Sequence, residues 1–179
     1  MFAFLIVLLI VAILALIVKI AIIIQGDAEF DFQVDEKEKW QIEKVTVDTV
    51  TLSTCLPFVN RGKQDGTLSD VWPRHQLAEE QFDLIKVSSR LYLAAKPRGD
   101  DYWEALLVFR GQRGMIKLVV TLAAIQGDIA AVLPSMPDMP IDIIYQVTAR
   151  SDWYIDKTRL LLTYHDISMA MTEFSGKVD

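Results

Sequence analysis

The stretch Phe2–Ile24, FAFLIVLLIVAILALIVKIAIII, decides how the rest of the chain is arranged. Apart from one charged residue, Lys19, it contains only Phe, Leu, Ile, Val and Ala. An α-helix rises about 1.5 Å per residue, so this run reaches roughly 34 Å, which exceeds the hydrocarbon core of a bilayer at about 30 Å. We therefore predict a transmembrane anchor over residues 1–25. The residues assigned to this anchor include Phe2, Leu9, Leu16, Lys19 and Ile24.

A cleavable signal peptide is the main alternative to a retained anchor. Signal peptides place a basic segment before about 7–15 apolar residues. Here the apolar run is longer and no Lys or Arg precedes it, so we expect the segment to be retained. The residues that follow it, 26–40, are mostly acidic, and positive-inside counting finds no basic flank on that side. We expect the N-terminus inside and the following domain outside the cytoplasm.

Residues 26–40 read as a charged juxtamembrane linker, because their Asp and Glu side chains favour hydration over packing. The alternation of Phe30, Phe32 and Val34 leaves a short first strand open as the alternative. After this segment we predict a β-sandwich over residues 41–167. The last residues, 168–179, show no strong pattern and are expected to form a loosely held tail.

The sandwich prediction rests on apolar residues that recur with period two, which is typical of half-buried strands. The clearest runs are Ile85–Leu93, Met115–Ala124 and Ile141–Val147. Glycine-rich turns at Asn60–Gly66 and Arg110–Gly114 are interpreted as hairpin loops. The fold class is therefore mainly β, with a transmembrane helix followed by an antiparallel immunoglobulin-like sandwich.

One short helix is expected within this sandwich. Residues 127–133 favour a helix, with Asp128 as its N-cap and three prolines after it. Pro57 favours an edge or the end of a strand, because proline lacks the N–H that a central strand needs.

The segment Pro57–Val71, PFVNRGKQDGTLSDV, resembles a bacterial immunoglobulin-like pattern. In that pattern an Asn-x-Gly turn joins two core strands, and a later Gly-Thr leads into the return strand. A single spanning helix followed by such a sandwich is similar to LEA14/WHy-like envelope proteins. The match covers about a tenth of the chain, and the Asn-Pro-Asn signature of that family is missing. The resemblance implies a fold and no particular activity.

Charge and composition exclude several classes of function. The formal net charge of −6 is opposite to that of nucleic-acid binders. Cys55, His75 and His165 are the only Cys and His residues and are far apart in the sequence, so we expect no metal site and no cofactor. Motifs for a nucleophile elbow or a phosphate-binding loop are also missing. We therefore expect that the protein is not an enzyme.

Aromatic and methionine side chains near turns are the candidate contacts for a protein partner, since Trp and Tyr are enriched at binding hot spots. The candidates are Trp72, Trp103, Trp153, Tyr154, Met136 and Met139. The expected partners are the lipid bilayer and other membrane or envelope proteins. Our first hypothesis is a scaffold or accessory subunit, and the alternative is a carrier that holds an apolar ligand or lipid between the two sheets.

Overall fold

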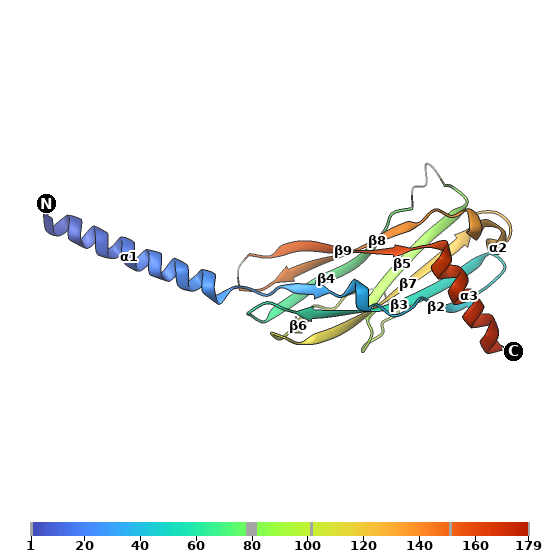
Figure 1. Cartoon of the computed structure of the whole chain (residues 1–179), viewed down its shortest axis with the longest axis horizontal. Helices are drawn as coiled ribbons and strands as arrows, with labels where there is room; N and C mark the ends of the chain where they lie inside the picture. The colour runs from blue at the N-terminus through green and yellow to red at the C-terminus, as the bar shows by residue number, and fades with distance from the viewer. Residues whose placement is uncertain (1, 78–81, 101, 151, 179) are drawn as a thin grey trace.

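The computed structural model describes residues 2–77, 82–100, 102–150 and 152–178. Helix α1 (Phe2–Gln25) extends from one end of a β-sandwich and points away from it (Figure 1). Its side chains have no part in the core of the sandwich, and the apolar residues along its length are exposed.

The sandwich consists of two antiparallel sheets. The first sheet has the order β1-β3-β7-β5, with β2 also pairing with β3, and the second has the order β6-β4-β8-β9. The strands are β1 (Phe30–Phe32), β2 (Gln41–Val45), β3 (Thr49–Asn60), β4 (Gly66–His75), β5 (Ile85–Leu93), β6 (Leu106–Val108), β7 (Arg113–Ala124), β8 (Met139–Thr148) and β9 (Tyr154–Leu162). Counting β1 and β2 together as the first strand gives the ABED and CFG sheets of an immunoglobulin-like domain, with β6 added beside β4. The predicted fold class is confirmed as mainly β, with an N-terminal apolar helix followed by an antiparallel immunoglobulin-like sandwich.

The core lies between the two sheets and follows the period-two pattern. Alternate residues of β3, β7 and β8 are buried, as at Leu52 and Leu56 in β3 and at Ile141 and Ile143 in β8. Strands β3 and β7 pair over their whole length, from Thr49 opposite Ala123 to Val59 opposite Arg113. This long pairing makes β3 and β7 the centre of the first sheet.

Two turns that we interpreted as hairpin loops instead connect the two sheets. Asn60–Gly66 leads from β3 in one sheet to β4 in the other, and Arg110–Gly114 leads from β6 to β7. The adjacent hairpins are β2–β3 and β8–β9. Alternation identifies a strand and its buried face, but both sheets bury one face in the same core, so the pattern does not assign a strand to a sheet.

Residues 26–40 are part of the sandwich, and their interpretation as a linker was wrong. The alternative first strand is confirmed: Phe30 pairs with Asn60, and Phe32 pairs with Phe58. The rings of Phe32 and Tyr145 lie 4.6 Å apart between their centroids. The 3-10 helix η1 (Val34–Glu36) follows, and Trp40 is buried. The charged residues of this segment lie among buried aromatic residues. Burial of these aromatic side chains offsets the conformational entropy that is lost when the segment is ordered.

Pro57 lies inside β3 and not at a strand end. Its carbonyl accepts a hydrogen bond from the N–H of Gln33, at 2.9 Å. The N and C=O of one strand residue point to the same side, so the missing N–H faces η1 and not β7. On this side, β3 pairs with β2 as far as Ser53 and with β1 from Phe58 onward, so Pro57 lies in the gap between these two partner strands. Proline is therefore tolerated in this central strand because its partner edge is interrupted.

The short predicted helix is confirmed. Helix α2 (Ile129–Val132) begins after Asp128, whose carboxylate accepts the N–H of Ala130 at 2.8 Å. The 3-10 helix η2 (Leu133–Ser135) follows directly, and Pro134 lies in its first turn.

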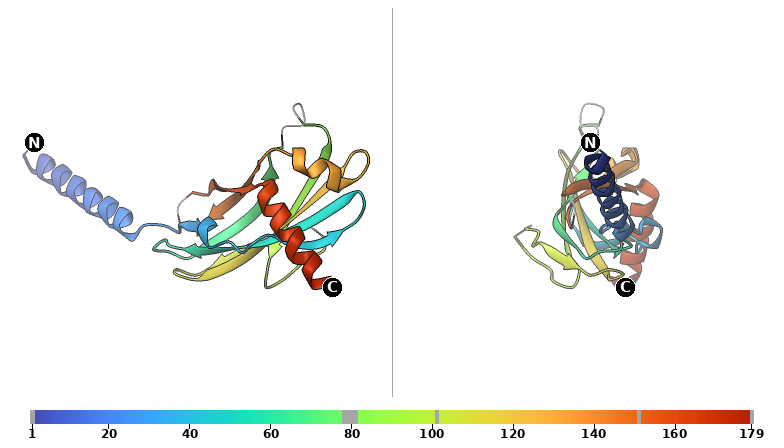
Figure 2. Two further views of the ribbon diagram at one scale, coloured as in Figure 1. Left: turned by 45° about the vertical axis from the view of Figure 1, so that its right-hand side comes forward. Right: turned by 90° about the vertical axis from the view of Figure 1, so that its left-hand side faces the viewer.

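The tail was wrongly expected to be loosely held. It forms helix α3 (Tyr164–Val178), which packs along β2 and crosses one side of the sandwich (Figure 2). Ile167 and Ala170 are buried on its inner face. The hydroxyl of Thr163 and the carboxylate of Asp166 each accept a backbone N–H of the other residue, which forms a capping box at the N-terminus of the helix.

Candidate functional site

The anchor residues lie on a helix that the sandwich does not cover. Phe2, Leu9, Leu16 and Ile24 are all exposed, and Lys19 is exposed among them. Within the described residues, α1 is the helix that is long and apolar enough to cross a membrane. Such an apolar surface is far larger than soluble monomers normally leave exposed.

The predicted partner contacts do not form one surface. Met139 has 0 % of its surface exposed and Met136 is also buried, so these two do not lie on an exposed contact surface. Trp103 is buried as well, but it lines a hollow that is described below. Met139 begins β8 on its inward side, and Met136 follows η2 into the core. Flexible methionine side chains fill such core positions readily. Proline-rich surroundings therefore did not indicate an exposed loop.

The remaining aromatic candidates lie in different places. Trp72 is half-buried on β4, and Tyr154 is half-buried with its hydroxyl donating to the carbonyl of Ala28 at 3.2 Å. Trp153, next to the β8–β9 turn, is 61 % exposed. Because β8 runs from Met139 towards this turn, Trp153 lies at the opposite end of the sandwich from the buried methionines. Trp153 is the single candidate that is fully available to a partner.

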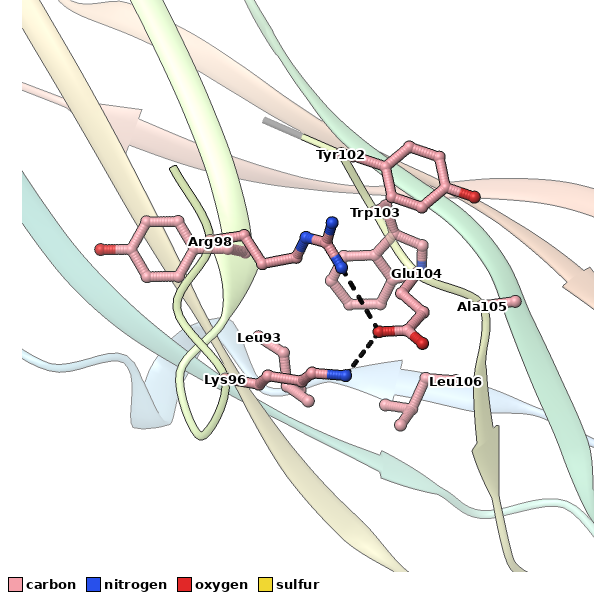
Figure 3. A pocket seen from close by; sticks show the side chains of 9 residues that line it. Leu93, Lys96, Arg98, Tyr102, Trp103, Glu104, Ala105 and Leu106 are labelled. Carbon is pink, nitrogen blue, oxygen red and sulfur yellow. Dashed lines mark hydrogen bonds and ion pairs between the residues drawn. The ribbon is translucent and has the colours of Figure 1, made fainter. Parts of the chain in front are cut away.

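A hollow on the sandwich lies where its two sheets open at one side. Strand β5 is an edge of the first sheet, β6 is an edge of the second, and the chain between them forms the wall. We call this hollow, of about 210 Å³, the lateral pocket. Its lining consists of Tyr92, Leu93, Lys96, Arg98, Tyr102, Trp103, Glu104, Ala105 and Leu106 (Figure 3).

Trp103 is the apolar centre of the lateral pocket. Its ring is buried, and its indole N–H donates to the carbonyl of Leu68 on β4 at 3.0 Å. Leu93 and Leu106 line the pocket from the two edge strands. The hydrogen bond to Leu68 fixes the Trp103 ring between the sheets. An apolar group that entered the pocket would therefore meet a preformed surface.

Charged side chains at the lateral pocket hold one another in place. Glu104 accepts from Lys96 at 2.6 Å and lies 3.6 Å from Arg98 (Figure 3). Arg98 also binds both oxygens of Asp100, at 2.6 and 2.9 Å, and its guanidinium lies 5.4 Å from the centre of the Tyr102 ring. The rim therefore carries two positive and two negative charges.

These ion pairs also set the protonation of the rim. The hydrogen bonds from Arg98 hold the pKa of Asp100 at about 2, and the hydrogen bond from Lys96 lowers the pKa of Glu104. Both carboxylates are consequently ionised at neutral pH. The rim therefore carries a fixed pattern of charge at neutral pH.

The structure brings together two polar residues that the sequence analysis treated separately. The Nδ1 atom of His75 on β4 lies 2.9 Å from the hydroxyl oxygen of Ser89 on β5. A serine beside a histidine is one element of nucleophilic catalysis, which also needs donors for the oxyanion. We assign this contact to the packing of β4 against β5, where it satisfies two partly buried polar groups. Their separation in sequence and their location in different sheets hid the pair from a motif search.

Metal binding has no support in the described ranges of the chain. Within residues 2–77, 82–100, 102–150 and 152–178, no group of three or more His, Cys, Asp or Glu side chains is arranged to hold an ion. The Cys55 thiol is half-buried, and desolvation raises its pKa, which keeps it protonated at neutral pH.

Comparison with known proteins places the chain near several β-sandwich domains at low similarity. No family model and no curated protein matches it. The GAE domain of GGA2p from Saccharomyces cerevisiae is similar over 76% of this chain and 98% of its own, with 9% identity and a TM-score of 0.36. The yeast GGA1 GAE domain covers 69% and 98%, with 10% identity and a TM-score of 0.36. A protein from Archaeoglobus fulgidus covers 74% and 97%, with 7% identity and a TM-score of 0.33.

Proposed function

We propose that the protein is a non-enzymatic, single-pass scaffold or accessory subunit whose β-sandwich contacts other proteins in a cell envelope. One observation carries this proposal: α1 exposes its apolar side chains along its whole length while the sandwich has a complete core of its own. Exposing such an apolar helix to water is energetically unfavourable, whereas the hydrocarbon core of a bilayer accommodates it. The arrangement of one helix before a sandwich is also what the resemblance to LEA14/WHy-like envelope proteins implies.

The proposed orientation is N-terminus inside and sandwich outside the cytoplasm. The support is the same as in the sequence: the segment that follows α1 is mostly acidic, and basic residues are favoured on the cytoplasmic side of a spanning helix. In this orientation the sandwich stands on the outer side of the membrane, attached through Gly26 and β1.

The lateral pocket is the surface that we propose for a protein partner. It combines Trp103, Tyr102 and Arg98, and these three residue types dominate binding hot spots. Its volume of about 210 Å³ lies below the roughly 300–1,000 Å³ of small-molecule sites and suits one inserted side chain. We expect a partner segment that places an apolar side chain against Trp103 and polar groups against the charged rim.

The packing between the sheets favours a protein partner over the carrier hypothesis. A lipid carrier requires an apolar cavity of several hundred Å³. The side chains that meet between the sheets, including Phe58, Leu118 and Ile143, are fully buried within one continuous cluster. A bound lipid would have to displace them. The carrier therefore stays an alternative that needs a rearranged core.

The decisive experiment isolates the tagged full-length protein from its native membranes in mild detergent. A scaffold is expected to elute as a complex with a defined stoichiometry by light scattering. The double variant Arg98→Ala/Tyr102→Ala should lose the partner. The matched control Lys86→Ala/Tyr164→Ala, with both residues exposed elsewhere, should retain it.

Elution of the wild-type protein alone as a monomer would overturn the subunit hypothesis. Lipid extraction and mass spectrometry of the same sample test the carrier. One tightly retained lipid that survives the Arg98→Ala/Tyr102→Ala change, in the absence of a protein partner, would favour the carrier instead.

A further inference from the structure

The sandwich is fastened to the last turn of α1 by side chains of the β3–β4 loop. Lys63 donates through Nζ to the carbonyl of Ile24 at 3.1 Å, and Gln64 donates through Nε2 to that of Gln25 at 3.3 Å. Gly26 follows with φ of +63°, which is the left-handed conformation of a helix C-cap. The end of the helix is therefore capped by the domain, and the base of the sandwich lies directly beside the last turn of α1.

A hollow of about 370 Å³ lies at this attachment, and we call it the junction hollow. Ile22, Ile23 and Gly26 line it from the helix side, and Asp27 and Arg150 complete it. Arg150 follows β8, and its backbone N–H donates to the Asp27 carboxylate at 3.2 Å. The hollow thus has an apolar wall from the helix and a cationic side chain from the sandwich.

The guanidinium of Arg150 is available to a ligand. The residue is exposed, and none of the ion pairs within 4.0 Å in the described part of the chain involves it. Asp27, the nearby acid, accepts the backbone N–H groups of Ala28 and Arg150. Lys63, whose side chain lies beside Gly26, is engaged with the carbonyl of Ile24.

Two exposed aromatic side chains lie at the same end of the sandwich. Phe109 belongs to the β6–β7 connection and Trp153 to the β8–β9 connection, and both connections lie on the side from which α1 extends (Figure 1). Aromatic side chains, Trp above all, are enriched at the membrane–water interface. Because the junction hollow lies at this same end of the sandwich, the exposed aromatic residues fit a base that touches the headgroup layer.

We propose that the junction hollow binds the headgroup of a membrane phospholipid. The Arg150 guanidinium donates two parallel hydrogen bonds to the phosphate oxygens, which is the geometry that arginine favours with phosphate. The first part of the acyl chains lies along Ile22 and Ile23. This inference rests on the proposed membrane anchor, and it assigns to the lipid the role of fixing the tilt of the sandwich on the bilayer.

The test uses full-length protein in nanodiscs and native mass spectrometry of the lipid that remains bound after release. Phosphatidylglycerol is the probe, and monogalactosyldiacylglycerol, which lacks phosphate, is the comparison lipid. Wild type should retain one phosphatidylglycerol and no galactolipid. Arg150→Gln should retain about tenfold less, because a charge-assisted pair is lost. Arg150→Lys should lie between them, and the matched control Arg74→Gln on β4 should equal wild type.

Equal retention by wild type and Arg150→Gln, or equal retention of the two lipids, would overturn the proposal. Complete competition by inorganic phosphate would also overturn it, since the site would then bind the anion without the lipid. Flotation of the same variants with vesicles separates the two proposals. Protein that fails to float contradicts the anchor, whereas protein that floats without lipid retention contradicts only the junction hollow.

Discussion

Asn60 is the residue on which several connections of the sandwich depend. Its side chain is fully buried, and its Oδ1 accepts the N–H groups of Glu29 and Gly62 at 3.3 and 3.0 Å. Its Nδ2 donates to the carbonyls of Gln64 and Val108 at 2.9 and 3.2 Å. One amide therefore joins the segment after α1, the β3–β4 loop and β6.

Asn60→Asp should destabilise the protein by about 3 kcal/mol or more. The change removes both donors and places a carboxylate oxygen against the carbonyls of Gln64 and Val108, while the size of the side chain stays the same. Urea unfolding of the full chain in detergent, followed by tryptophan fluorescence, measures the loss. Gln146→Glu, the same change at a half-buried position of β8, should cost far less. Equal losses would contradict the role of the Asn60 bonds.

Two buried tryptophans differ in whether their indole N–H has a partner. Trp103 donates to the Leu68 carbonyl, whereas the Nε1 of the buried Trp40 has no partner within the described residues. Trp103→Phe should therefore cost about 1–2 kcal/mol more than Trp40→Phe, since both lose similar volume but only the first breaks a buried hydrogen bond. Paired unfolding curves give the difference, and a larger loss for Trp40→Phe would contradict it.

Asp142 makes the stability of the protein sensitive to acid. Its carboxylate is covered on the outer face of β8, and the Arg159 guanidinium, followed by the Lys157 ammonium, holds its pKa at about 2 although burial acts in the opposite direction. The folded pKa is below the usual value of 3.8. The stabilisation is therefore complete above about pH 4 and disappears as the pH falls towards about 2.

The expected size of this effect is about 1–2 kcal/mol, because the two cations are half-exposed and screened by solvent. Asp142→Asn should reduce the loss of stability between about pH 5 and about pH 2.5 by this amount. Unfolding curves at both pH values measure it, with Asp70→Asn on exposed β4 surface as the control. An unchanged pH dependence in Asp142→Asn would exclude the assignment.

At the scale of the element, α3 closes one side of the sandwich. Ile167 on its inner face is fully buried, whereas Met169 is 49 % exposed. Ile167→Ala should cost about 2–4 kcal/mol, since it removes buried methylene groups and leaves a cavity. Met169→Ala should change the free energy of unfolding by less than about 0.5 kcal/mol. Similar small effects for both would show that the helix is not part of the cooperative unit.

The strands were predictable to the extent that one sheet face is apolar and the other polar. Ile85–Leu93 and Met115–Ala124 appear as β5 and β7 with their alternation intact. Helix α3 was missed because polar residues surround its two buried positions, Ile167 and Ala170, so the apolar stripe is narrow. The hairpin interpretations failed because the choice between two sheets depends on contacts distant in sequence.

The candidate site could be predicted only in part for a related reason. Aromatic composition pointed to Trp103 and Trp153, and Trp103 does line the lateral pocket. Composition did not distinguish a buried ring such as Trp103 from an exposed one such as Trp153. The pocket also needs Leu93 and Leu106 from edge strands of opposite sheets, a contact that no local pattern encodes.

At the scale of the whole molecule, the proposed orientation can be tested with one engineered thiol. Cys55 is the single cysteine, so Cys55→Ser provides a background without thiols. Lys86→Cys on the exposed face of β5 should then react with a membrane-impermeant maleimide from outside intact cells. Labelling that requires permeabilised cells would reverse the orientation, and mass shifts on gels report the result.

The pairing of β1 with β3 determines how the protein would respond to a mechanical load. A partner on the sandwich would pull against α1 along the length of the molecule, and this force enters through β1 (Figure 1). Because β1 runs antiparallel to β3, and the hydrogen bonds lie across the strands, all three residue pairs bear the force together in shear. A tether built in this way resists detachment better than one whose bonds open one after another.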